Sequence, residues 1–502
     1  MKAHEHRALG DAGTAGGQVN LGGDGPGERF LLSFGDVVAL SGDFFVADGF
    51  PVAAPRRVAS PTEALVSDGL FALALRPGAG GERPGTRAEI VTALKVMAAD
   101  EGLPDSRLEP GGELAAYVLP GNGAGEDDVE RRVRDRFLAL GASNDDHFVA
   151  PGPRGPATAG DRPPPRFSSA LQAYRVLHER ALDEAWHLGR RRGELSRAMA
   201  REAAAQHHLT DAFAAGHLRT PVAAMREFWQ ALYPGFWHGL RRKVASDTAA
   251  ALRELAWPLR LVPEGVVGRR ALAAVEARTA GYPRLSLGDL LAKVFHDWDN
   301  VHGLALEGGG MVFGDGCLDQ GLTRELAIRA VRAGVDDVEV AFELGAGGLR
   351  SEDAGRGMAA SGPALYAAVR AATGAPDDMF LAETMVPRPS PENPVQNWRA
   401  TDVDELWSSP IVGSRGTTVG TAVNEALEAG EELPRRLESL ARGVADSLDL
   451  PPLPGLRRWM GRKACQAYHH GFLENLAADP KGAVSASVGE LQPRPRAPVG
   501  VA

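Results

Sequence analysis

Residues 206–217 read QHHLTDAFAAGH. In a helix, side chains four positions apart lie one above the other, so His207 and Asp211 can face the same metal ion. His217 follows Gly216, a residue type that ends or bends helices and can thereby turn the imidazole toward a second, neighbouring ion. A carboxylate between two imidazoles can bridge two metals. Three candidate ligands within eleven residues favour a metal site over isolated structural histidines.

The sequence around this stretch predicts a mainly α-helical fold. From 167 to 218, apolar residues recur at helical spacing over about two long helices, with a break near Gly189 and Gly193. Further helices are expected at 61–68, 87–101, 127–140, 225–257, 268–281, 285–298, 324–344, 362–373, 419–441 and 456–476. Residues 308–316, GGGMVFGDG, predict a small β-hairpin or a tight loop at the mouth of a site.

Length and composition limit the class of protein. A chain of 502 residues exceeds the usual size of one core, so two domains or one domain with large insertions are expected. The 55 basic and 65 acidic residues give a formal charge of -10, which argues against a long nucleic-acid groove. The cysteines Cys317 and Cys465 form neither a disulfide framework nor a CxxC site, so a metal would depend on His, Asp, Glu or Asn.

Composition shifts divide the expected chain into four regions. These are a flexible N-terminal tail at 1–29, a helical core at 30–320, a C-terminal helical extension at 321–478 and a disordered tail at 479–502. The core would contain long loops and a helical insertion at about 225–285. No secretory signal or membrane-spanning apolar segment is evident in the sequence as written, so a cytoplasmic location is expected.

Further candidate ligands lie on both sides of the central stretch. Nine of the 13 histidines fall between positions 147 and 302. His147 belongs to the tripeptide 146–148, Asp-His-Phe, and His296 and Asn300 are again four residues apart. His178 lies in an expected helix, where it can be a metal ligand, a hydrogen-bond donor to a ligand or a core residue. His4 and His6 fall in the expected flexible tail.

The order of these motifs resembles the zinc-dependent phospholipase C superfamily, which also contains the single-strand-specific zinc nucleases. The superfamily pattern is His, three residues, Asp, five residues and His, with a later His. It is similar here to His207, Asp211, His217 and His296. A Ser-His-Phe element of the phospholipases is similar to residues 146–148.

The closer resemblance is to a bacterial branch of phosphatidylcholine-type phospholipases C. Its HFLTD-F-GH-R stretch is similar to residues 207–219, its ALSGDF-like element to residues 39–44 and its GDG-L element to residues 314–318. The resemblance covers roughly residues 30–320 and implies a helical zinc phospholipase C-like core. The resembled enzymes are often exported.

The chain also differs from this pattern. The phospholipases use an N-terminal Trp and a nearby His for one ion, whereas this chain starts with Met1 in a polar segment. Asp43 can replace such ligands or be a surface turn residue. The last carboxylate of the pattern is Asn300, a poor zinc ligand for which Asp297 or His302 could substitute. The 78 residues between His217 and His296 also exceed the spacing in compact relatives.

The resemblance implies two or three zinc ions that hydrolyse a phosphodiester. Asp211 would bridge ions, with His147 and His207 on one and His217 and His296 on the next. Asp43, His178 and Asn300 are further candidate metal ligands. Asp43 or Asp297 would orient the attacking water, and Arg219 would clamp a phosphate or serve a structural role.

Three functions remain open on this sequence. The first is a phospholipase C that releases a phosphorylated head group, which would bring transient contact with a membrane surface. The second is a nuclease or small-molecule phosphodiesterase on the same core, although the acidic charge makes nucleic acid the less favoured partner. The third is a helical scaffold with degenerate ligands. No sequence feature sets the oligomeric state.

Overall fold

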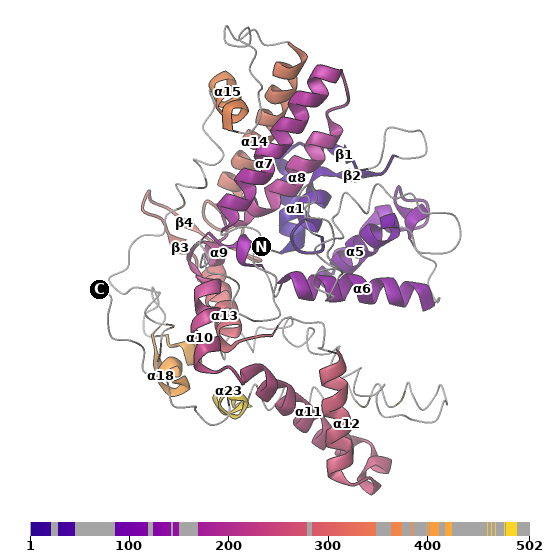
Figure 1. The fold of residues 1–502 in the computed structure, drawn as a ribbon, viewed down its shortest axis with the longest axis vertical. Helices are drawn as coiled ribbons and strands as arrows, with labels where there is room; N and C mark the ends of the chain where they lie inside the picture. The colour runs from indigo at the N-terminus through magenta and orange to yellow at the C-terminus, as the bar shows by residue number, and fades with distance from the viewer. Residues whose placement is uncertain are drawn as a thin grey trace. The chain divides into compact units, whose positions relative to one another are not determined.

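The computed structural model is mainly α-helical, as the sequence predicted (Figure 1). It describes residues 2–21, 29–45, 86–118, 124–141, 144–149, 169–278, 284–347, 363–373, 402–410, 417–423 and 478–488, with the single positions 382, 385, 398, 400, 459, 463, 467 and 476. The helix expected at 61–68 and most of those expected at 419–441 and 456–476 lie outside these residues.

The chain forms two compact units. The first unit contains Met1–Thr220 and Asp299–Arg388, and the second contains Pro221–Trp298 and Pro389–Ala502. The second unit begins close to the insertion expected at about 225–285. Residues 321–388 belong to the first unit and not to a separate C-terminal region, because the helix that starts at Thr323 packs against helices that precede the insertion.

The first unit contains most of the long helices. Its α-helices are α1 (Ala3–Gly13), α2 (Phe34–Leu40), α5 (Thr86–Glu101), α6 (Ala124–Gly141), α7 (Ala170–Arg191), α8 (Ser196–Asp211), α9 (Ala215–Arg219), α14 (Thr323–Ala346) and α15 (Pro363–Thr373). Its short 3-10 helices are η1 (Ser106–Leu108), η2 (Ala115–Tyr117) and η3 (Asp145–His147). Strand β1 (Gln18–Asn20) pairs antiparallel with β2 (Leu31–Ser33), and β3 (Leu304–Ala305) pairs antiparallel with β4 (Met311–Val312). The expected hairpin is therefore present, displaced toward the N-terminus.

Helices α7, α8 and α14 pack against one another at the centre of the first unit (Figure 1). Two glycines allow α7 and α14 to approach closely. A Cβ atom at Gly189 would overlap the carbonyl oxygen of Phe342, and one at Gly345 would overlap that of Trp186. Backbone-to-backbone contact of this kind leaves these helices little freedom to shift, and α8 is held against both of them.

Helix α1 crosses α2 at short range. A Cβ atom at Gly10 would lie 2.8 Å from the Cα atom of Gly35, and one at Gly35 would overlap the carbonyl oxygen of Arg7. The Arg7 guanidinium also pairs with the buried carboxylate of Asp36 at 3.1 Å. Residues 3–13 are therefore an ordered helix, and the expectation of a flexible tail is wrong for them. Glycine serves close helix packing here, which composition alone does not distinguish from flexibility.

The second unit is also helical. It contains α10 (Val222–Leu232), α11 (Phe236–Leu255), η4 (Trp257–Leu261), α12 (Glu264–Arg278), α18 (Val403–Ser408), α23 (Pro480–Val488) and the greater part of α13 (Leu287–His302). Trp229 is fully buried, and its indole N–H donates to the carbonyl oxygen of Trp398 at 3.0 Å. The side chains of Trp229 and Trp398 are therefore part of the core of this unit. The tail expected to be disordered from 479 begins with α23, which packs against α11.

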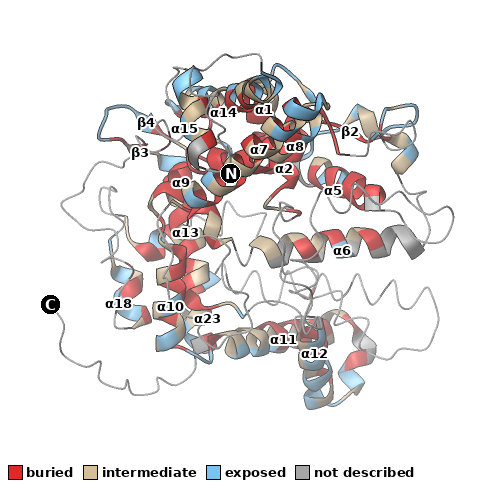
Figure 2. Ribbon diagram, turned by 45° about the horizontal axis from the view of Figure 1, so that its top comes forward, coloured by how far each residue is buried: buried red, intermediate tan, exposed pale blue. Residues whose placement is uncertain are grey.

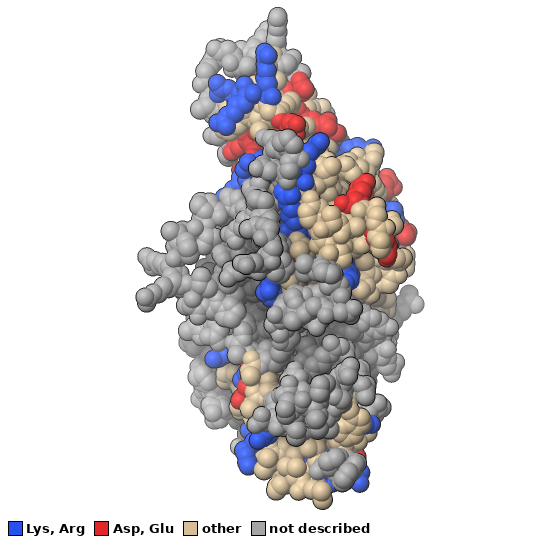
Figure 3. All heavy atoms as spheres, turned by 90° about the vertical axis from the view of Figure 1, so that its right-hand side faces the viewer, with Lys and Arg blue, Asp and Glu red and all other residues tan. Residues whose placement is uncertain are grey.

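Burial and surface charge differ between elements. Helices α2 and α8 are buried over most of their length, whereas α11 and α12 alternate buried with exposed positions (Figure 2). Figure 3 shows one face, on which Lys and Arg side chains lie beside Asp and Glu among the described residues. Within the part of the chain that the structure describes, no helix is long and apolar enough to span a membrane.

Candidate metal centre

Helix α8 brings its polar side chains into the interior of the first unit. Every residue from Glu202 to Asp211 is buried (Figure 2). His207 and Asp211 share one face, and the Nε2 atom of His207 lies 3.4 Å from Oδ2 of Asp211. Because buried polar groups cost free energy unless they are paired, the environment of these two side chains decides what the helix can do.

Four imidazoles surround the carboxylate of Asp211. His6 Nε2 and His217 Nδ1 each lie 3.3 Å from Oδ1. His147 Nδ1 lies 2.9 Å from Oδ2, the oxygen that also faces His207. Together with Asp43, these residues are called the Asp211 cluster. They come from α1, the turn after α2, η3, α8 and α9, so the fold assembles the cluster from five segments.

Backbone carbonyls fix the protonation of two of these rings. Nδ1 of His207 donates to the carbonyl oxygen of Val38 at 2.9 Å, and Nδ1 of His217 donates to that of His147 at 2.7 Å. A carbonyl oxygen can only accept, so each Nδ1 carries the proton. The Nε2 of a neutral His207 therefore presents a lone pair to the carboxylate of Asp211. A cation between the two atoms would convert this repulsion into attraction.

Electrostatics support the same conclusion. Burial lowers the pKa of His207 well below its ordinary value of 6.5, and the neighbouring His6 lowers it further. For Asp211, burial raises the pKa, but His217, His6 and His207 together bring it well below its usual range. An ionised carboxylate therefore faces a neutral imidazole. This donor set fits a divalent metal such as zinc, which binds neutral imidazole and carboxylate oxygen.

Asp43 enters the cluster through a turn that requires glycine. Ser41 bridges to Phe45, and Gly42 between them has a φ of 86°. A Cβ atom at Gly42 would overlap the ring of His207 and lie 3.0 Å from Cε1 of His147. One ligand atom from each of Asp43, His147 and His207 lies within 4.8 Å of the others, as three ligands of one ion require. Asp43 is partly exposed, and burial raises its pKa.

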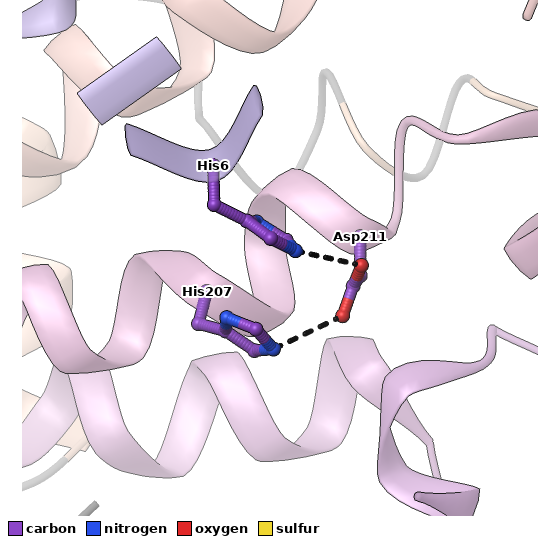
Figure 4. A group of neighbouring side chains, drawn as sticks. All are labelled: His6, His207 and Asp211. Atoms are coloured by element: carbon purple, nitrogen blue, oxygen red, sulfur yellow. Dashed lines mark ion pairs between the residues drawn. The ribbon is translucent and has the colours of Figure 1, made fainter. Parts of the chain in front are cut away.

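His6 forms a second candidate ligand group with His207 and Asp211, whose ligand atoms also lie within 4.8 Å of one another (Figure 4). The His6 ring is 1 % exposed and stacks on His207 with centroids 4.1 Å apart. His6 was not predicted as a ligand, because residues 1–29 were expected to form a flexible tail. The available signal was helical spacing: Ala3, His6, Leu9, Gly10 and Gly13 are all buried on one side of α1.

A backbone hydrogen bond holds the segments of His147 and His217 together. His147 belongs to η3 and His217 to α9, and Val149 N donates to the carbonyl oxygen of His217 at 2.9 Å. The His217 ring also stacks on Phe148, with centroids 4.7 Å apart. Burial lowers the pKa of His147, but its hydrogen bond to Asp211 and the charges of Asp211, Asp146 and Asp43 raise it to about 9. A proton on His147 therefore balances Asp211 in the absence of a metal.

The side chain of Asn300 holds the turn before His217. Its Oδ1 atom accepts from Gly216 N at 2.7 Å, and a Cβ atom at Gly314 would overlap that oxygen. The side chain is 1 % exposed. Asn300 was predicted as a metal ligand, and in the structure its oxygen accepts from the backbone and thereby holds α9.

His178 lies in a different group. Its Nδ1 atom is 2.7 Å from Oε2 of Glu202, and its Nε2 atom is 3.7 Å from Oδ2 of Asp337. Tyr174 and Gln206 donate to Glu202, and Arg370 donates to both oxygens of Asp337. These six residues are called the Glu202 cluster. His178 therefore lies with Glu202 and Asp337 and outside the Asp211 cluster, because this position on α7 faces α14 and the N-terminal part of the α8 polar face.

Arg219 is engaged as well. Its Nε atom donates to Oδ2 of Asp299 at 2.9 Å, and its Nη2 atom donates to Oδ1 of the same carboxylate. In this bidentate pair, the carboxylate of Asp299 occupies the guanidinium N–H donors that a phosphate would use. The structure therefore supports the structural alternative for Arg219 and not the phosphate clamp.

The remaining predicted residues, His296 and Asp297, belong to the second unit. Nδ1 of His296 and Oδ1 of Asp297 lie 2.9 Å apart, and Lys293 Nζ donates to the same oxygen at 2.5 Å. His302, the alternative to Asn300, is exposed at the end of α13. His296 and Asp297 thus remain candidate ligands of one ion, with ligand atoms within 4.8 Å of each other, whereas His302 is exposed.

Comparison of the chain with protein-family models, with curated proteins and with solved structures found no match in any of the three. The likeness to zinc phospholipases C therefore rests on the motifs in the sequence. In the structure, four residues of these motifs lie together with His6 and Asp43 in the Asp211 cluster. They are His147, His207, Asp211 and His217.

Proposed function

We propose that this protein is a zinc-dependent phosphodiesterase, and that its substrate is a phospholipid cleaved in the manner of a phospholipase C. The observation that carries the proposal is the single buried carboxylate of Asp211 with two candidate ligand groups beside it. A carboxylate with imidazoles on both oxygens suits two neighbouring ions. Zinc ions bound there would supply Lewis acidity toward a phosphoryl oxygen and lower the pKa of water.

Different side chains of the Asp211 cluster would hold the two ions. His147, His207 and Asp43 would hold one ion, and His6 with Asp211 would hold the other, while Asp211 serves both. The hydrogen bonds to Val38 and His147 carbonyls keep His207 and His217 in fixed tautomers, so little reorganisation is needed on binding.

Asp43 is the candidate for contact with water and substrate. It is partly exposed, whereas Asp211, His207 and His6 are buried. An entering phosphodiester would therefore meet Asp43 before the other acidic group. The raised pKa of Asp43 suits a carboxylate that accepts a proton and orients water at the phosphorus.

The test is metal content and hydrolysis in one preparation. The purified protein and its His207→Ala/Asp211→Ala double variant would be analysed for zinc, then assayed on phosphatidylcholine vesicles and on single-stranded DNA. We expect about two zinc ions per chain and release of phosphocholine by the wild type, with both lost in the variant. Arg175→Ala, which alters an exposed pair on α7, is the matched control and should behave as the wild type.

Two outcomes would favour the alternative functions. Hydrolysis of DNA without release of phosphocholine would replace the lipid with nucleic acid on the same ions. Absence of zinc, even after zinc is added back, would favour the helical scaffold. Two observations favour the scaffold: Arg219 pairs with Asp299, and the side-chain oxygen of Asn300 accepts a backbone hydrogen bond.

A further inference from the structure

Two parallel imidazoles address the two oxygens of Asp211. His6 and His207 stack with an interplanar angle of 27°, and their Nε2 atoms face Oδ1 and Oδ2 respectively (Figure 4). Each ring is held at its Nδ1 atom. The acceptor for His207 is the backbone carbonyl of Val38, whereas His6 Nδ1 lies 2.7 Å from the hydroxyl oxygen of Thr210.

The direction of the hydrogen bond between His6 and Thr210 follows from the other bonds of Thr210. Its hydroxyl donates to the carbonyl oxygens of Gln206 at 2.8 Å and His207 at 2.9 Å. A hydroxyl has one proton, and here the proton is used by the helix backbone. The oxygen can therefore only accept from His6, so Nδ1 of His6 carries a proton. Nε2 of a neutral His6 then presents its lone pair to Asp211.

We propose that Thr210 is a positioning residue for the second ion: it fixes the tautomer and orientation of His6 so that Nε2 can bind the ion shared with Asp211. The inference rests on the proposed function, because it takes the ion from there. Thr210 is fully buried on α8, and its side chain has restricted χ1 freedom. It thereby connects the N-terminal helix to the metal-binding helix through one directed hydrogen bond.

A purely helical role for Thr210 is the competing explanation, since buried threonines often donate to a carbonyl four residues earlier. Thr92 on α5 provides the comparison. It is buried and donates to the carbonyl oxygen of Ala88 at 2.7 Å. Thr92→Val therefore measures the loss of such a bond in the first unit at a position outside the Asp211 cluster.

The experiment compares Thr210→Val, Thr210→Ser and Thr92→Val with the wild type by calorimetric zinc titration of chelator-stripped protein. Valine keeps the shape and removes the hydroxyl, whereas serine keeps the hydroxyl. We expect Thr210→Val to weaken one of two ions by about 10- to 100-fold and to leave the other unchanged. Thr210→Ser and Thr92→Val should bind both ions as the wild type does.

A double-mutant cycle tests whether Thr210 acts through His6. In a His6→Ala background, Thr210→Val should cause no further loss of zinc affinity. Wild-type zinc binding by Thr210→Val, equal loss in Thr210→Ser, or an additive effect in the His6→Ala background would each overturn the inference. Nitrogen NMR of the zinc-free protein adds an independent readout, because the Nδ1–H signal assigned to His6 should shift in Thr210→Val and not in Thr92→Val.

The outcomes separate this inference from the proposed function. If the wild type binds two zinc ions and the variants follow the expected pattern, the inference holds even if phosphodiesters are not cleaved. If the wild type binds no zinc, both the inference and the proposed function are overturned.

Discussion

The Asp211 cluster and the Glu202 cluster lie in one unit, share helix α8 and are both buried, but their charges are balanced in different ways. In the Glu202 cluster, Arg370 supplies a permanent positive charge to Asp337, and His178 lies between Asp337 and Glu202. The ion pairs of Asp211 are instead with imidazoles, two of which are fixed as Nδ1 donors to carbonyls. A built-in guanidinium makes a structural cluster, whereas a carboxylate whose partners are imidazoles, of which His207 is neutral, can accept an added cation.

The largest expected effect comes from breaking the Glu202 cluster, whose acidic and basic side chains balance one another. Asp337→Asn removes the charge that pairs with Arg370 and should lower the free energy of unfolding by about 3 kcal/mol, because the partly buried guanidinium of Arg370 loses its charged partner. Urea unfolding measures the change. The folded variant should still bind zinc as the wild type does.

The control for this change is Arg175→Ala, which removes an exposed pair with Glu179 on α7 and should cost about 0–1 kcal/mol. Loss of zinc from folded Asp337→Asn protein would mean that the two clusters are one functional unit.

Gly42→Ala tests the closeness of the backbone to His207. The new Cβ atom would overlap the imidazole, and the φ of 86° is strained for alanine, so the loss of stability should be roughly 2–4 kcal/mol. Zinc affinity should fall too.

Gly111→Ala is the matched variant for Gly42→Ala, because Gly111 has a φ of 91° and nothing within 4 Å of the added atom. It should cost only about 1 kcal/mol and leave zinc binding intact. Equal losses in both variants would show that backbone strain alone explains Gly42.

Zinc itself should stabilise only through the Asp211 cluster. At a free concentration about 100 times the Kd, one bound ion should raise the free energy of unfolding by about 2.7 kcal/mol. Asp337→Asn should retain this gain and His207→Ala/Asp211→Ala should lose it. Thermal unfolding with and without chelator makes the comparison, and a gain that persists in the double variant would locate the ion elsewhere.

The carboxylate of Asp105, which is partly buried and pairs with Arg107, should show how a cluster with its own guanidinium responds to pH. The hydrogen bond from Arg107 lowers the pKa of Asp105 from 3.8 to about 2, against the effect of burial. Because the folded pKa is depressed, this stabilisation is full above pH 3.8 and is lost as the pH falls through about 2. Once solvent screening of this partly exposed pair is allowed for, the shift corresponds to about 1 kcal/mol at neutral pH.

Asp105→Asn should therefore lower stability by about 1 kcal/mol at neutral pH and flatten its dependence on pH between 4 and 2. Urea unfolding at several pH values checks this. An unchanged acid limb in the variant would assign the acid sensitivity to other carboxylates.

Much of the site was predictable because helical spacing is local. His207 and Asp211 face one another as their separation requires, and His147 of the Asp-His-Phe element lies beside Asp211. His178 and His6 could not be assigned in the same way. Each depends on which helix packs against its face, and no spacing within α7 or α1 encodes that choice.

The sequence by itself determined the helical class, the shared face of His207 and Asp211 on α8 and the motif order that resembles zinc phospholipases C, because these depend on residues within a few turns of one another. Tertiary structure alone decided that His6 joins Asp211, that His178 joins Glu202 and that Arg219 is held by Asp299. The physical reason is that ion pairing and burial depend on approach in space. His6 and Asp211 are 205 positions apart in the sequence, His178 and Glu202 are 24 apart, and Arg219 and Asp299 are 80 apart.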